Sequence, residues 1–258
     1  QMKTLKFKKK INLLNLNKLY QYKLNNNSIN LINEDLKIKK AFQKKNKNSK
    51  KYINNCFEIA IKLIKNGFSN KLINGPISKK KFLNKKFLGM TEYFAKKFEK
   101  KNVAMLIFNK SLSVCPITTH LPLKKVAKKI NKKTIIQKVD LINSFYKKNF
   151  GFKPKIASTG LNPHCESVDI FNEDKKILVP TIKYLKHRGI RISGPFPADT
   201  IFLKSNRKNY DVILGMYHDQ VLTPIKTLFE YNAINITLGL PFVRISPDHG
   251  PNESMLGK

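Results

Sequence analysis

The spacing of apolar residues along the chain predicts a succession of strands and helices. Between residues 53 and 64, apolar side chains recur every three or four positions, as in an amphipathic helix, with Ser49 as a possible N-cap and Asn66-Gly67 as its end. Short apolar runs between turn-prone residues predict strands. We expect strands over 13–20, 29–32, 71–74, 103–108, 112–118, 156–159, 190–193, 210–214 and 234–237, and further helices over 91–100, from 135 to near Gly151, and over 174–187.

The order of these elements indicates the class of fold. Beyond residue 70, strands alternate with helices of about ten residues or more, which is typical of βαβ units and a largely parallel sheet. No Gly-x-Gly-x-x-Gly sequence follows a predicted strand, so a Rossmann dinucleotide site is not indicated. We therefore predict an α/β protein with mixed, mostly parallel sheets.

Length and composition are those of a folded protein. The 258 residues suffice for one large α/β domain or two modest lobes, and 41% of them are hydrophobic. The longest clean apolar run, 103–108, is far too short to span a bilayer, and no secretory signal is visible after Gln1. Three irregularly spaced cysteines indicate neither a disulfide framework nor a cysteine-based zinc module. We expect a cytoplasmic protein without a membrane segment.

The net charge of +35 raises the alternative of a nucleic-acid-binding protein. Specific recognition of bases and phosphates relies on arginine, however, and only four of the 51 basic residues are arginines, none of them clustered. Lysine is enriched along the whole chain together with asparagine and isoleucine. We interpret the charge as a compositional bias of a solvated surface and expect no specific nucleic-acid partner; a continuous lysine-lined groove would favour the alternative.

Three of the five histidines occupy equivalent places. His120, His164 and His218 each follow a predicted strand. Ligand sites in parallel α/β sheets gather outside the carboxyl ends of the strands, and three imidazoles at one locus can hold a divalent ion while leaving a position open for substrate. A structural role for each histidine stays open, because no two of them are close in sequence. His187, at the end of a predicted helix, is interpreted as a surface residue.

A second group of polar residues lies near the end of the chain. Lys226, Asn235 and Arg244 combine a cation, an amide and a second cation in a segment rich in glycine and proline. Such a combination suits a small phosphorylated or carboxylated substrate. Arg244 is the most informative of the three, because arginine is scarce here and its segment is otherwise apolar.

Six short motifs, in order, resemble those of the 4-hydroxythreonine-4-phosphate dehydrogenase family. The resemblance runs from about Asn74 to Lys258. One motif alone has little specificity, whereas six in the family's order are hard to obtain by chance. They are 118–123 (TTHLPL), 160–164 (GLNPH), 194–200 (GPFPADT), 216–220 (MYHDQ), 235–241 (NITLGLP) and 246–250 (SPDHG).

The resemblance implies a two-lobed α/β/α fold similar to isocitrate and isopropylmalate dehydrogenases, with residues 1–85 as an N-terminal lobe and 86–258 as the metal- and substrate-binding lobe. It implies an active site shared across a homodimer interface, and NAD or NADP bound without the glycine-rich turn. The implied divalent ion is zinc, cobalt or magnesium. The implied site residues are His120, His164 and His218 as metal ligands with catalytic roles, Asp199 and Asp248 as further catalytic residues, and Thr91, Lys226, Asn235 and Arg244 as substrate contacts.

The implied reaction belongs to pyridoxal phosphate biosynthesis. The substrate, 4-phosphohydroxy-L-threonine, is oxidised at its C3 hydroxyl with hydride transfer to the nicotinamide. The resulting β-keto acid loses carbon dioxide and gives 3-amino-2-oxopropyl phosphate. The metal ion lowers the pKa of the hydroxyl and stabilises the developing enolate.

The chain also departs from the family pattern. Met90 stands where the family carries histidine, and a thioether is a poor hydrogen-bonding group. This departure keeps open an alternative substrate, threonate or erythronate 4-phosphate. The family's opening strand is not visible after Gln1, and the chain stops at Gly257-Lys258 where family members continue. We therefore expect a fragment lacking both termini, in which activity is impaired.

Overall fold

The computed structural model describes residue 6 and residues 8–38, 48–78, 82–83, 86–87, 89–167 and 171–251. The chain divides into two units, one of Gln1–Phe68 with Pro251–Lys258 and one of Ser69–Gly250. The expected boundary between lobes at residues 85 and 86 stays a prediction. The expectations about the two chain ends concern Gln1 and Gly257-Lys258, which lie outside the described residues.

The first unit contains a small parallel strand pair and one long helix. Strand β1 (Ile11–Leu13) pairs with β2 (Ile29–Leu31), and α1 spans Ser49–Lys65. The strand expected over 13–20 is wrong, because a 3-10 helix covers Leu16–Gln21, where the side chain of Asn15 accepts a hydrogen bond from the Asn17 amide. Ser49 lies inside α1 rather than capping it.

The second unit is built on one eight-stranded sheet in the order β3-β10-β9-β4-β5-β8-β6-β7. Four of the neighbouring pairs are parallel (β3–β10, β5–β8, β8–β6 and β6–β7) and three are antiparallel (β10–β9, β9–β4 and β4–β5), which confirms the expected mixed, mostly parallel sheet. The strands are β3 (Lys71–Ile73), β4 (Ala104–Phe108), β5 (Ser113–Thr118), β6 (Ile156–Thr159), β7 (Ile192–Phe196), β8 (Val212–Tyr217), β9 (Ile234–Leu238) and β10 (Val243–Pro247).

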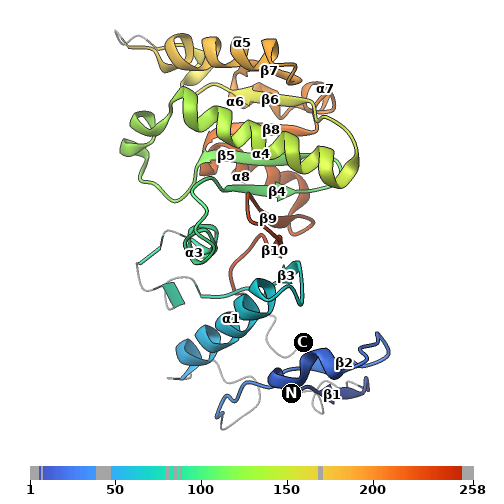
Figure 1. Cartoon of the computed structure of the whole chain (residues 1–258). Coiled ribbons are helices and arrows are strands. Elements are labelled where there is room, and N and C mark those ends of the chain that lie inside the picture. Colours follow the sequence, from blue (N-terminus) through green and yellow to red (C-terminus); the bar gives the residue numbers. More distant parts are fainter. Residues whose placement is uncertain are drawn as a thin grey trace. The chain divides into compact units, whose positions relative to one another are not determined.

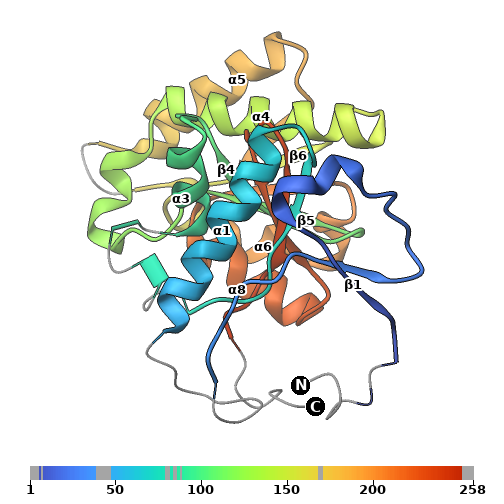
Figure 2. The same ribbon diagram turned by 60° about the horizontal axis from the view of Figure 1, so that its bottom comes forward.

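Helices cover both faces of this sheet, as the α/β class requires. Helices α4 (Lys132–Phe150) and α5 (Val179–His187) lie on one face, and α6 (Ala198–Ile201) and α8 (His218–Phe229) lie on the other (Figures 1 and 2). Each face has its own buried apolar cluster against the strands. The remaining α-helices with defined bounds are α3 (Met90–Lys97) and α7 (Lys204–Arg207).

Two elements next to the candidate site were not expected from the sequence. Helix α8 begins with the polar run His218, Asp219 and Gln220 and contains Pro224, which conceals its helical periodicity. Strand β10 carries Arg244 at a buried position and ends in Pro247, so its sequence resembles a loop. No helix in the described part of the chain has the length and apolarity needed to cross a membrane.

Substitution of Leu214 tests whether β8 lies in the centre of this core. This residue is 0% exposed, so Leu214→Ala should lower the free energy of unfolding by about 2–5 kcal/mol through lost burial and a residual cavity. Leu203→Ala is the matched control: Leu203 is 55% exposed, and the change should cost less than about 0.5 kcal/mol. Urea denaturation followed by circular dichroism measures both, and equal losses would contradict the described core.

Candidate active site

A cavity of about 280 Å³ in the second unit collects most of the residues singled out from the sequence. Its walls come from strands β4, β9 and β10 and the segments next to them, from the start of α3 and from α8. Seven of the nine expected site residues line it, whereas His164 and Asp199 do not. The seven are Thr91, His120, His218, Lys226, Asn235, Arg244 and Asp248.

Parallel pairing of β5 with β8 brings two imidazoles together at the rim of this cavity. Thr118 and Tyr217 are register partners at the carboxyl ends of these strands, and the Thr118 hydroxyl donates to the Met216 carbonyl at 2.8 Å. His120 and His218 follow directly, and their ring centroids lie 5.5 Å apart. The expected positions of both histidines after strands are therefore confirmed.

Carboxylates lie beside both imidazoles. Nδ1 of His218 lies 2.6 Å from a carboxylate oxygen of Asp219. The Thr119 hydroxyl donates to Oε1 of Glu92 at 3.3 Å. Glu92 and His120 both lie close to Gly89, where a Cβ would be 2.9 Å from Glu92 Oε2 and from His120 Cε1. A carboxylate that fixes the orientation and tautomer of an imidazole is the usual environment of a metal-binding histidine. The donor set therefore fits a divalent ion.

Arg244 is a buried cation in the wall of the cavity. It is 1% exposed, and its Nε and Nη2 donate to Oδ1 of Asn74 at 2.9 and 2.7 Å, while Nη1 donates to the Thr237 hydroxyl at 3.2 Å. Burial lowers the pKa of the guanidinium to about 10, so it stays charged at neutral pH. Among the described residues no carboxylate forms an ion pair with Arg244. A buried cation held only by neutral groups suits an anionic ligand.

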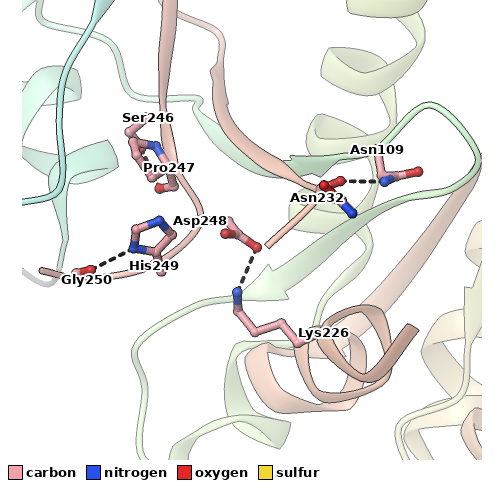
Figure 3. A network of polar contacts seen from close by, with 8 residues as sticks. All are labelled: Asn109, Lys226, Asn232, Ser246, Pro247, Asp248, His249 and Gly250. Carbon is pink, nitrogen blue, oxygen red and sulfur yellow. Dashed lines mark hydrogen bonds and ion pairs between the residues drawn. The ribbon is translucent and has the colours of Figure 1, made fainter. Parts of the chain in front are cut away.

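A second cation faces the same cavity. Nζ of Lys226 lies 2.7 Å from Oδ2 of Asp248, whose side chain is 1% exposed (Figure 3). Within the described ranges, the other oxygen of Asp248 and Oδ1 of Asn235 are buried without a hydrogen-bond partner. Buried acceptors without donors are costly, so these two oxygens call for a donor supplied by a ligand.

His249 lies beside this pair, and its ring geometry fixes its tautomer. Its Nδ1 lies 2.8 Å from the Gly250 carbonyl (Figure 3). A carbonyl oxygen only accepts, so Nδ1 carries the proton and Nε2 is the acceptor in the neutral ring. The ring also packs edge-on against Tyr231, with centroids 5.3 Å apart.

His164 and Asp199 lie elsewhere, at the carboxyl ends of β6 and β7. Both are exposed; His164 sits in the 3-10 turn Pro163–Cys165 and Asp199 in α6. The pKa of the Cys165 thiol is raised by burial first and then by nearby carboxylates, including that of Asp199. Within the ranges the structure describes, no three or more His, Cys, Asp or Glu side chains of one chain could hold a metal ion. One chain therefore brings together two of the three expected ligands.

Five residues at or next to the site were not singled out from the sequence. Asp219, Gln220 and His249 lie inside motifs that were recognised, and Glu92 follows the expected substrate contact Thr91, so adjacency to these residues is a signal that could have found them. Asn74, which binds the guanidinium of Arg244 from a position 170 residues away, has no comparable signal.

Comparisons with known proteins agree with the geometry. Residues 2–258 match the family described as pyridoxal phosphate biosynthetic protein PdxA. The chain is similar to the 4-hydroxythreonine-4-phosphate dehydrogenases of Sulfurihydrogenibium sp. (42% identity, covering 89% of this chain and 71% of the relative) and Pseudoalteromonas translucida (36%, covering 80% and 64%). It is also similar to the crystal structure of the enzyme from Klebsiella pneumoniae (26% identity, TM-score 0.76, covering 96% and 77%).

Arg244→Lys tests the cavity as an anion site. Lysine keeps the charge but loses the fork that binds Asn74 and faces the cavity, so affinity for inorganic phosphate should fall about 10- to 150-fold, the equivalent of one charged hydrogen bond. Arg191→Lys, at an exposed position, is the matched control and should leave the affinity unchanged. Isothermal titration calorimetry measures both; equal affinities in the two variants would contradict this role of Arg244.

Proposed function

The chain belongs to the family of pyridoxal phosphate biosynthetic protein PdxA, and from this premise we propose that it oxidises and decarboxylates 4-phosphohydroxy-L-threonine with NAD or NADP as hydride acceptor. The chain spans 64% and 71% of the length of the two curated relatives above, so the activity of the whole enzyme is part of the proposal. The observation that carries it is a buried arginine and a lysine in one cavity with two imidazoles.

The two cations are assigned to the phosphate. Arg244 offers a planar fork suited to bidentate contact with phosphate oxygens, and Lys226 adds a point charge on the same cavity wall. Thr91 and Asn235 contribute a hydroxyl and an amide to the same cavity. Binding energy gained at the phosphate holds the far end of the substrate against the imidazoles and so supplies orientation for the reaction.

The buried acceptors favour an amino acid as substrate. Oδ1 of Asp248 and Oδ1 of Asn235 have no donor among the described residues. Threonate and erythronate 4-phosphates carry a hydroxyl in place of the ammonium group of 4-phosphohydroxy-L-threonine, and a hydroxyl donates one hydrogen bond where the ammonium group donates three and adds a positive charge. Pairing this ammonium with Asp248 would satisfy the buried carboxylate, which also holds Lys226 in place.

His120 and His218 are assigned to the metal ion, with Asp219 orienting the second imidazole. His164 completes the ligand set from a second copy of the chain, since it is exposed and outside the cavity of its own chain. Three imidazoles suit zinc or cobalt better than magnesium. When bound, the ion supplies Lewis acidity to the substrate hydroxyl, and the nicotinamide accepts the hydride.

The protein's own contribution to the chemistry is placement and protonation. Asp248, Asn235 and the two cations fix the substrate, so that its hydroxyl-bearing carbon has one orientation. After carbon dioxide leaves, a proton must return to the carbon that carried it, and His249, a cavity residue that is not assigned to the metal ion, can deliver one through Nε2. Asp199, in α6, stays assigned as a further catalytic residue that supports the site. The cytoplasmic location remains a prediction.

Met90 favours the alternative that the substrate is threonate or erythronate 4-phosphate. Its side chain is 5% exposed and lines the cavity next to Thr91, at the family's histidine position. The thioether removes one strong hydrogen bond from the site, so the contacts to the substrate differ from the family pattern. Turnover of the three phosphorylated substrates, followed by NADH absorbance, separates the two proposals.

Mixed dimers test the shared site. His164→Ala and His218→Ala should each abolish metal-dependent turnover, while His187→Ala, at an exposed position at the end of α5, should retain it. Mixing the two inactive variants and allowing subunits to exchange should restore roughly a quarter of wild-type activity, because half of the dimers then carry one intact site. No recovery after demonstrated exchange would contradict a site that takes His164 from the second chain.

Met90→His tests the substrate assignment. A histidine at this position adds a donor to the cavity and should lower KM for 4-phosphohydroxy-L-threonine about 10-fold with little change in kcat, as expected for a contact made equally in ground and transition states. Met90→Leu keeps the volume without a donor and should leave KM unchanged. A lower KM for threonate or erythronate phosphate alone would favour the alternative substrate.

A further inference from the structure

Gln220 connects the ends of two neighbouring strands. It lies in the first turn of α8, two residues after His218. Its Oε1 accepts hydrogen bonds from the Met216 amide at 2.7 Å and from the Thr159 hydroxyl at 2.8 Å, and its Nε2 donates to the Gly160 carbonyl at 2.8 Å. Three of the four hydrogen bonds that a carboxamide can make therefore join the end of β8 to the end of β6.

The loop that follows β6 is held from its other side by Asp174. This carboxylate is 0% exposed and accepts from the Leu161 amide at 2.7 Å and from the Asn162 amide and side chain at 3.0 and 2.9 Å. Gly160 lies between the two clamps, where a Cβ would come within 2.8 Å of the Asp174 carboxylate. The first residues of the loop are thus fixed by Gln220 on one side and Asp174 on the other.

The same loop carries His164 in a strained conformation. His164 and Cys165 have φ values of 54° and 63°, so two successive residues other than glycine occupy the left-handed region. Such conformations persist only where the surroundings over-determine them. The His164 ring is exposed, so its position depends on the backbone contacts that fix residues 160–162.

We propose that Gln220 is a positioning residue that fixes the loop of His164 to the start of α8 and thereby sets where the His164 imidazole is presented. The inference rests on the proposed function in so far as His164 and His218 are metal ligands. It goes beyond that function because it assigns a role to Gln220, which is not a metal ligand. Gln220 sets the position of the segment that carries His164 relative to the segment that carries His218. Loss of such outer contacts typically lowers metal affinity about 10- to 100-fold.

Two substitutions separate the contacts of Gln220. Gln220→Glu keeps an acceptor for Met216 and Thr159 but places a second acceptor against the Gly160 carbonyl, so it removes only the contact to the loop. Gln220→Leu removes all three contacts. The matched controls are Gln137→Glu and Gln137→Leu in α4, outside this network. Zinc affinity is measured by chelator competition, and amide hydrogen exchange is measured on the metal-free protein.

We expect both Gln220 variants to bind zinc about 10- to 100-fold more weakly and to exchange amides of residues 160–167 faster, with exchange in β4 and in the Gln137 variants unchanged. Folded variants with wild-type zinc affinity and wild-type exchange in this segment would overturn the inference; if Gln220→Leu does not fold, Gln220→Glu decides. A wild-type protein that binds no zinc would overturn the proposed metal site, while exchange in the metal-free protein still supports or overturns the role of Gln220.

Discussion

Parallel pairing of β5, β8 and β6 is the constraint on which the candidate site depends. Strands that run in the same direction end at the same edge of the sheet, so the segments carrying His120, His218 and His164 emerge side by side although they are far apart in sequence. The strands pair in one register, with Thr118 opposite Tyr217 and Ser158 opposite Leu214, and apolar clusters bury both of their faces. Side-chain contacts at the strand ends, from Thr118 to Met216 and from Gln220 to Gly160, then carry this register into the loops.

The antiparallel part of the sheet makes a different contribution, a buried positive charge. Arg244 in β10 is the register partner of Thr237 in β9, and the residue after β3, Asn74, meets the guanidinium on its other side. Neutral partners satisfy the hydrogen-bond donors without neutralising the charge, so the cation is available to a ligand anion. The net charge of +35 has no part in this arrangement, because the site depends on one of four arginines and one lysine rather than on the lysine-rich surface.

Much of this arrangement could be predicted from the sequence, and the failures have physical causes. The apolar run 103–108 and the run of small and apolar residues 156–159 give strands β4 and β6, because their side chains are buried on both faces of the sheet. The run 13–20 does not, since Asn15 caps a 3-10 turn instead. Strand β10 was not predicted because it contains a buried arginine, and helix α8 was not predicted because it begins with a run of polar residues. Neither sequence shows a regular apolar spacing, so both conformations depend on tertiary contacts.

The same distinction explains which site residues meet in one chain. The proximity of His120 and His218 is set by the register of their strands, so it can be predicted from the strand pattern of the sequence. The exposure of His164 cannot, because it depends on two left-handed residues held by contacts at 160–162. A ligand that reaches into the cavity of another copy has to lie at one position relative to that cavity, since a site misplaced by about 1 Å loses much of its activity. A rigid loop favours the proposed shared site, and Gln220, Asp174 and Glu173 are described side chains that hold it.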